Sequence, residues 1–260
     1  MRIFIFALLS QLQNSISAQI RAFAVMARSW RKLPIPSRIC QFAPSATLRQ
    51  NHRICVGKRV LQLTLLISTL TAYTPKDYSN LLGMQGFSDP LLQMHFKLYE
   101  GYVKNSTDLL AKLKSMTDPT TYEYGALKRR FGWEFDGMRL HELYFGNLGG
   151  KAPLDKGSLL YQAILSQFGS FEKWKKDFIA TGTIRGIGWA LLYLDREQGQ
   201  LINVWINEHD TGHLAQGYPI LIMDVFEHAY MPQYGLDKGK YIDAFFSNID
   251  WSVVAKRYSQ

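Results

Sequence analysis

The apolar residues of the chain follow two different periods, one in its middle and another toward its end. From residue 88 to residue 183 they recur every three or four positions, the spacing of one face of an α-helix. After residue 188 they gather in short runs rich in β-branched and aromatic residues, which are typical of strands. The pattern therefore predicts helices first and a small sheet later, which is an α+β fold.

The helical part divides at capping residues and glycines. Residues 88–116 indicate a helical hairpin whose first helix is capped by Ser88. Residues 121–146 predict another helix, which the glycines of GNLGG stop. Residues 158–183 supply two further helices, divided near Gly169. This part of the chain therefore predicts an N-terminal helical hairpin followed by shorter helices.

The later part predicts a three-stranded antiparallel sheet. The runs WALLYLD and LINVWINEH, within residues 189–209, flank a polar turn that contains Gly199, which is the pattern of a β-hairpin. The run YPILIM, residues 218–223, predicts a third strand, and residues 243–258 predict one closing helix. We expect the flanking helices to cover the sheet, forming a C-terminal α/β domain.

Charge is distributed unevenly along the 260 residues. Residues 1–76 hold 11 of the 30 Lys and Arg residues and none of the 21 Asp and Glu residues. The remainder therefore has 19 basic and 21 acidic residues, a net charge of −2, although the whole chain carries +9. A nearly neutral body does not predict nucleic-acid binding.

The basic segment, residues 1–72, has the composition of an organelle transit peptide. Two other interpretations are upstream sequence from a mis-assigned start, which would leave the protein cytoplasmic, and a basic arm for a membrane or nucleic acid. Its second apolar run, residues 60–73, is too short to span a bilayer comfortably. We expect residues 1–72 to be disordered, with a helical hairpin domain at 73–155 and the α/β domain at 156–260.

Histidine is the main candidate for chemistry in the body of the chain. Two histidines lie among aromatic residues in predicted helices, in MHFKLYEGY and LHELYFGN, and Asp224 lies four residues before His228. Both cysteines, Cys40 and Cys55, fall in the basic segment, so the body offers no thiolate. Three imidazoles and one carboxylate suit iron, manganese or zinc. The pattern leaves open whether these groups meet, because a lone histidine is more often a core residue and Asp224 can be a helix cap.

The segment DVFEHAY, residues 224–230, resembles the C-terminal metal signature of the iron/manganese superoxide dismutases, usually D-x-W-E-H-A-Y. The resemblance extends in the same order through HELYFGNL, GIGWALLYLD and NIDWSVVAKRY, and it covers the chain from about residue 73 to its end. It implies a helical hairpin followed by an α/β domain with a three-stranded antiparallel sheet, in agreement with the periodicity.

The resemblance also implies the chemistry. Superoxide would be converted to oxygen and hydrogen peroxide at one Fe or Mn ion per subunit, bound by His95, His141, Asp224 and His228 together with a solvent molecule. The sequence leaves open which of the two metals is used.

Further residues take family roles by the same resemblance. Tyr102 would be the gateway tyrosine, Trp189 would wall the cavity, and Tyr144 would pack against it. Glu227 would bond His228 of the partner subunit in a homodimer, with a tetramer left open. No nucleic-acid or membrane partner is expected.

The first ligand helix departs from the family pattern. The interval from His95 to Tyr102 is seven residues, whereas the family usually has eight. An ungapped alignment would place Met94 on the ligand position, but a thioether is a poor ligand for a hard metal. We therefore expect His95 to face the metal, with Tyr99 in the place of the family's second gateway histidine.

The residue that hydrogen-bonds the metal-bound solvent is normally a glutamine in this family. Gly137, four residues before His141, follows the manganese pattern, in which that partner comes from the sheet. His209 is the best candidate there, and His213 is expected to be a surface or loop histidine.

Two other functions compete with dismutation. A non-catalytic protein of the same fold, acting in a larger assembly, would be marked by lost ligands, but all four are present. A non-haem iron oxygenase needs two histidines and one carboxylate with open positions, so a fourth protein ligand argues against it.

Overall fold

A computed structural model describes residues 72–260 of the chain. The basic segment with Cys40 and Cys55 lies outside the described residues, apart from Ala72, and its transit-peptide, disorder and localisation hypotheses stay predictions. Among residues 72–260, no helix combines the length and apolarity needed to cross a membrane. The elements follow in chain order: 3-10 helix η2 (Ser79–Leu81), α3 (Asp89–Ser115), α4 (Tyr122–Phe145), α5 (Leu159–Phe168), α6 (Phe171–Thr183), β1 (Gly188–Asp195), β2 (Gln200–Asn207), β3 (Gly217–Asp224), α7 (Glu227–Tyr234), α8 (Lys238–Ser247) and α9 (Trp251–Tyr258).

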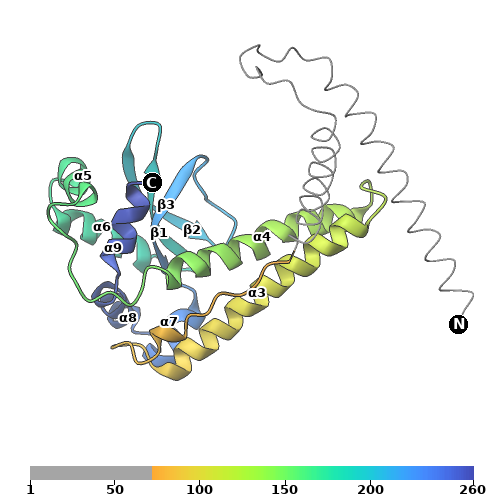
Figure 1. Cartoon of the computed structure of the whole chain (residues 1–260), viewed down its shortest axis with the longest axis horizontal. Helices are drawn as coiled ribbons and strands as arrows, with labels where there is room; N and C mark the ends of the chain where they lie inside the picture. The colour runs from red at the N-terminus through yellow and green to blue at the C-terminus, as the bar shows by residue number, and fades with distance from the viewer. Residues whose placement is uncertain (1–71) are drawn as a thin grey trace, which may run out of the picture. The chain divides into compact units, whose positions relative to one another are not determined.

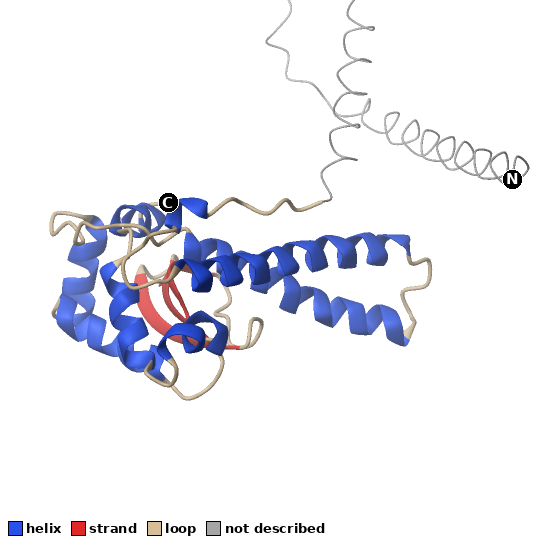
Figure 2. Ribbon diagram, turned by 90° about the horizontal axis from the view of Figure 1, so that it is seen from below, coloured by secondary structure: helices blue, strands red, loops and turns tan. Residues whose placement is uncertain are grey.

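The helical hairpin is made by α3 and α4, which run side by side away from the sheet (Figures 1 and 2). Ser88 caps α3 as predicted, since its Oγ accepts a hydrogen bond from the amide of Leu91 at 3.4 Å. The hairpin predicted within residues 88–116 is wrong, because α3 continues unbroken to Ser115. After Pro90 in its first turn, α3 contains no proline, and an isolated Gly101 weakens a helix without ending it.

The other helices preceding the sheet follow their sequence signals. Helix α4 ends at Phe145, before the glycines. Gly169 takes a φ of 80° after α5, the left-handed conformation that ends many helices, and Ser170 caps α6. The predicted division of residues 158–183 into two helices is confirmed. The domain division at residue 155 stays a prediction.

The three strands form an antiparallel sheet in the order β2-β1-β3, as predicted. The central strand β1 is buried along nearly its whole length. Trp189 pairs with Asp224 on β3 and with Ile206 on β2, so these three side chains share one face of the sheet.

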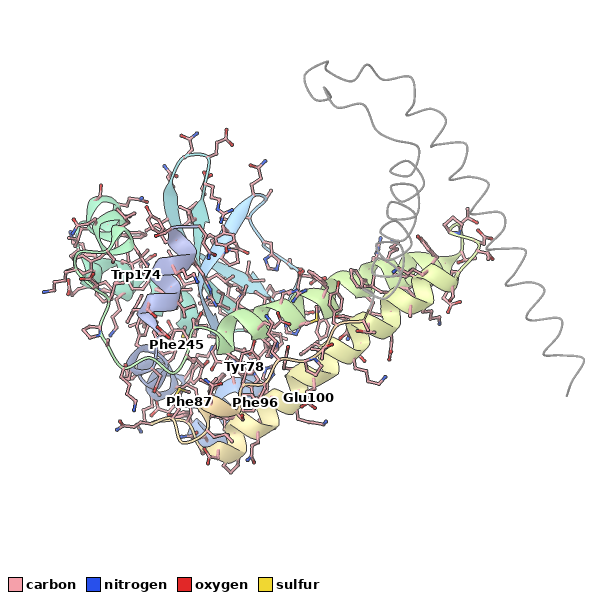
Figure 3. The ribbon with its side chains drawn as sticks, viewed as in Figure 1. Tyr78, Phe87, Phe96, Glu100, Trp174 and Phe245 are labelled. Carbon is pink, nitrogen blue, oxygen red and sulfur yellow. The ribbon has the colours of Figure 1, made fainter. Side chains whose placement is uncertain are left out.

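The two faces of the sheet are covered by different helices. On the face of Trp189, the ring of His141 from α4 lies 5.0 Å away, centroid to centroid. On the opposite face, Gly182 of α6 packs against Met223, whose Cε atom would have to move to admit a Cβ atom at Gly182. Figure 3 marks Trp174 on α6 and Phe245 on α8, two fully buried rings of this core.

The predicted single closing helix over residues 243–258 is wrong, because the structure has two helices there, α8 and α9. Asp250 starts the second one, since its carboxylate accepts hydrogen bonds from the amides of Ser252 and Val253. An aspartate at this position caps a new helix more readily than it continues an old one.

Candidate metal centre

Four elements bring one group of potential metal ligands together. His95 comes from α3, His141 from α4, Asp224 from the end of β3 and His228 from α7. One donor atom from each lies within 4.8 Å of the other three. Two ligand atoms that each lie about 2.1 Å from one ion are at most about 4.2 Å apart. A small movement of the four donor atoms toward one another would therefore let them bind a single ion.

The three imidazoles converge on one carboxylate oxygen. The Nε2 atoms of His95, His228 and His141 lie 3.1, 3.2 and 3.6 Å from Oδ2 of Asp224. The other oxygen, Oδ1, accepts a hydrogen bond from the amide of Phe226 at 2.9 Å. Asp224 is therefore not the cap of a helix: it ends β3, and α7 begins at Glu227.

His141 shows most directly that this group fits a metal. Its Nδ1–H donates to the carbonyl oxygen of Gly137 at 2.5 Å, which leaves Nε2 as an unprotonated acceptor in the neutral ring. That Nε2 atom is buried and has no hydrogen-bond partner. A ligand histidine that donates its other ring N–H to a backbone carbonyl has the usual arrangement at metal sites.

Burial and mutual proximity set the ionisation of the group. Burial lowers the pKa of His95 and lowers that of His141 further, so both rings are neutral, as metal binding requires. Burial raises the pKa of Asp224, but His228 and the hydrogen bonds from His228 and His95 outweigh it and hold the pKa below its usual value. The site therefore holds an anionic carboxylate beside the two neutral imidazoles of His95 and His141.

The α3 helix presents His95, not Met94, to this centre. The side chain of His95 is 2% exposed, whereas Met94 is 41% exposed on the outer side of the helix. Tyr102 follows seven residues later, about two turns along, and its ring stacks on that of His141 at 5.1 Å between centroids. Because α3 is uninterrupted, the interval of seven residues, one shorter than is usual in the family, still keeps His95 and Tyr102 on one side of the helix.

Tyr99, at the intermediate turn, points away from the centre. Its hydroxyl donates to Oε1 of Glu142 at 3.1 Å and accepts from the amide of Lys76 at 3.0 Å. Glu142, nearly buried, also accepts from Lys76 Nζ at 2.8 Å and from Arg139 at 2.7 Å. Tyr99 therefore joins a charged network that ties residues 73–78 to both helices, a role that the sequence did not reveal.

A hydrogen-bonded chain joins the three further predicted residues. Trp189 donates from Nε1 to Nδ1 of His209 at 3.0 Å, and Nε2 of His209 lies 2.8 Å from the hydroxyl of Tyr102. Because the indole is only a donor, Nδ1 of His209 must accept, and its proton sits on Nε2. Both nitrogens of His209 thus have protein partners, Trp189 and Tyr102, and a bond from His209 to a metal-bound solvent stays a prediction.

Trp133 packs beside His209 and Tyr102, a position that the sequence analysis did not predict. Its ring lies 4.4 Å from that of His209 and 5.7 Å from that of Tyr102, centroid to centroid. Trp133, Gly137 and His141 are spaced four apart on α4, so the helical period already placed them on one face. Tyr144 lies 6.4 Å from Trp189, centroid to centroid, as expected.

The two remaining predicted residues, His213 and Glu227, lie outside the group of candidate metal ligands. His213 is on an exposed loop, as expected, although both of its ring nitrogens are hydrogen-bonded. Glu227 is exposed at the start of α7 and forms no bond to His228 within the subunit.

Comparison with known proteins agrees with this geometry. Residues 156–257 match the family described as iron/manganese superoxide dismutases, C-terminal domain. The iron superoxide dismutase of Cupriavidus metallidurans is 37% identical over 182 residues, which are 68% of this chain and 90% of that protein. That of Aquifex aeolicus is 33% identical over 194 residues, 72% of this chain and 91% of that protein.

A manganese enzyme is also similar. Superoxide dismutase [Mn] 2 of Haloferax volcanii is 40% identical over 124 residues, 48% of this chain and 62% of that protein. The chain belongs to the iron/manganese superoxide dismutase family, as its signature predicted. Members named for either metal are similar to it, so similarity alone does not select between iron and manganese.

Proposed function

We propose that the protein is a superoxide dismutase that binds one Fe or Mn ion through His95, His141, Asp224 and His228. The observation that supports this most directly is the buried, unpartnered Nε2 of His141 facing the carboxylate on which the other two imidazoles converge. A bound iron or manganese ion supplies one-electron chemistry, by which two superoxide anions and two protons become oxygen and hydrogen peroxide. Three nitrogens and one carboxylate suit either metal.

Tyr102 is placed to supply a proton. Its hydroxyl accepts from Nε2–H of His209, so its own O–H is not used in that bond and is free to donate into the site. Burial raises the pKa of Tyr102 above its usual value, which keeps the phenol protonated. A proton is therefore held beside the site until a more basic peroxide or solvent oxygen takes it.

Trp189, His209 and Phe226 keep this region dry and fixed. The rings of His209 and Phe226 stack at 4.6 Å between centroids, and Trp189 is fully buried. Burial lowers the pKa of His209 to about 4, so the ring stays neutral and keeps the tautomer that Trp189 imposes. Because His209 stays neutral with its proton on Nε2, it remains the donor in its bond with Tyr102, and the Tyr102 hydroxyl remains the acceptor.

The experiment is to reconstitute the metal-free full-length chain separately with iron, manganese and zinc. Superoxide decay is followed by stopped-flow absorbance, and bound metal is measured in each sample. Iron or manganese should support turnover at about one ion per chain, whereas zinc, which has no redox chemistry, should bind without turnover. Binding of all three metals without superoxide decay would contradict the proposal.

We further propose that the active form is a homodimer in which Glu227 bonds His228 of the partner. The exposure of Glu227 and the partial exposure of His228 at the same end of α7 support this. Glu227→Ala should raise the dissociation constant of the dimer in sedimentation equilibrium. An unchanged dimer would contradict this contact.

A further inference from the structure

The loop that carries His209 has an unusual backbone. It follows β2, and Glu208, directly before His209, takes a φ of 53°, the left-handed region that side chains other than glycine seldom adopt. Asn207 and Thr211 close the loop with two backbone hydrogen bonds, at 2.8 and 3.3 Å. A strained turn of this kind persists only where its surroundings hold it.

His213 holds the backbone of His209 directly. Nε2 of His213 lies 2.8 Å from the carbonyl oxygen of His209, and because a carbonyl can only accept, this nitrogen carries the proton. Nδ1 of His213 then accepts from the hydroxyl of Tyr193 at 2.7 Å in the neutral ring. The imidazole is thus a rigid bridge between the sheet and the loop.

The central strand β1 braces His209 from two sides. Trp189 and Tyr193 are four residues apart on β1, so their side chains lie on the same face of the sheet. Trp189 bonds the side chain of His209, and Tyr193 bonds its backbone through His213. The central, nearly fully buried strand therefore holds the side chain of His209 through Trp189 and its backbone through Tyr193 and His213.

We infer that His213 is a positioning residue for the proposed reaction: it fixes the backbone of His209 so that Nε2–H of His209 stays bonded to Tyr102. This inference rests on the function proposed above. Without His213, the His209 carbonyl loses its donor and the strained turn at Glu208 loses one of its restraints. The Tyr102 hydroxyl would then be free to turn, although no metal ligand has changed.

Three variants of the full-length chain separate this role from a general effect on the loop. His213→Leu removes both bonds of the ring. His213→Gln keeps a carboxamide N–H that can donate to the His209 carbonyl. Thr211→Val is the matched control, because the Thr211 hydroxyl bonds only Asp210 at 3.3 Å and the backbone bonds to Asn207 stay.

Two readouts are made on metal-free protein: amide hydrogen exchange over residues 207–212, and imidazole nitrogen NMR of the His209 tautomer. A third is turnover per bound metal ion. We expect His213→Leu to speed exchange at least tenfold and to lower turnover about tenfold, the lower end of effects from residues that orient a metal site. Metal content should not change, and His213→Gln should recover most of both losses.

The inference is overturned if His213→Leu exchanges and turns over superoxide like Thr211→Val, or if His213→Gln is as impaired as His213→Leu. A fall in turnover with wild-type exchange and tautomer would overturn it as well. If the wild-type chain shows no dismutation with either metal, the proposed function fails, while the exchange and NMR data still decide whether His213 holds the loop.

Discussion

Gly137 lies directly beneath the ring of Tyr102: a Cβ atom at Gly137 would be 2.7 Å from Cδ1 and 2.9 Å from Cε1 of that ring. The carbonyl of the same glycine accepts the Nδ1–H of His141. Gly137 therefore has two effects. Its lack of a side chain makes room for the Tyr102 ring, and its carbonyl fixes the tautomer of His141.

Gly137→Ala should consequently harm the protein although alanine favours helices. The new methyl group must push the Tyr102 ring away and lengthen its bond to His209, at a cost of about 1–3 kcal/mol typical of overpacking. The free energy of unfolding, measured by urea denaturation, should fall, and turnover per metal ion should fall with it.

Gly132→Ala on the same helix is the control. A Cβ atom there meets nothing within 4 Å, so the free energy of unfolding should rise by about 0.5–1 kcal/mol with turnover unchanged. Equal effects of the two substitutions would show that Tyr102 does not need the space above Gly137.

His95→Ala should abolish metal binding, whereas Met94→Ala should leave it intact. His95 supplies a buried nitrogen 3.1 Å from Asp224 Oδ2, while Met94 lies on the outer side of α3. Metal content after dialysis, measured by mass spectrometry of the dissolved protein, checks this. Loss of metal from Met94→Ala alone would mean that the ungapped alignment is correct.

His209→Gln should retain the metal but change how the site uses it. Glutamine can accept from Trp189 and donate to Tyr102, yet its amide is longer and less rigid than the imidazole. The reduction potential and the ratio of iron-supported to manganese-supported activity should both shift. His228→Ala, in comparison, should empty the site, because it removes a ligand. An empty site in His209→Gln, or an unchanged potential and metal preference, would contradict the assignment of His209.

The stability contributed by His209 should depend on pH. Its pKa is about 4 in the folded chain, against 6.5 in a model peptide, because burial disfavours the charged ring. The unfolded state therefore binds more protons between these values, so the contribution is complete above pH 6.5 and is lost as pH falls toward 4. The loss is at most ~3 kcal/mol.

Urea denaturation of metal-free wild type and His209→Gln at several pH values tests this. Other buried histidines give a similar trend in both proteins, so the informative quantity is the difference between the two unfolding free energies. That difference should shift against wild type as the solution is acidified from pH 6.5 to pH 4. A constant difference would show that His209 has no depressed pKa.

Residues 1–71 should be dispensable, whereas residues 72–76 should not. A chain that begins at Ala72 keeps the bonds of Tyr73 to Thr107 and of Lys76 to Tyr99 and Glu142, so it should fold and keep full activity. A chain that begins at Asp77 loses them and leaves Glu142, nearly buried, with fewer donors, at a cost of about 1–3 kcal/mol. Thermal melts of both shortened chains and the full chain provide the measurement. Equal melting temperatures for both would remove any role for this segment.

Local signals in the sequence predicted most of the fold. Ser88 before α3, Gly169 after α5 and Gly199 between β1 and β2 act through their own backbone or through groups a few residues away. Such effects need no distant partner, so they can be read from a short stretch. The two errors in helix boundaries lie within residues 88–116, where one helix continues past Gly101, and within residues 243–258, where Asp250 caps a second helix.

The sequence also predicted the family and the residues that meet at the candidate metal centre, because the signature DVFEHAY and the helical histidines state which ligands are available. It did not predict how the hydrogen bonds around them are arranged. Whether Nδ1 of His209 accepts from Trp189, or His213 reaches the His209 carbonyl, depends on strand register and on distances between elements far apart in the chain.

What the sequence by itself determined is therefore the set of elements, the family and the chemical groups of the centre. Only the tertiary structure decided that Gly137 makes room for Tyr102, that Tyr99 bonds Glu142, and that both nitrogens of His209 have protein partners. The physical reason is that periodicity and caps are local, whereas these contacts depend on how α3, α4 and β1 pack, and packing sums many weak interactions over distant parts of the chain.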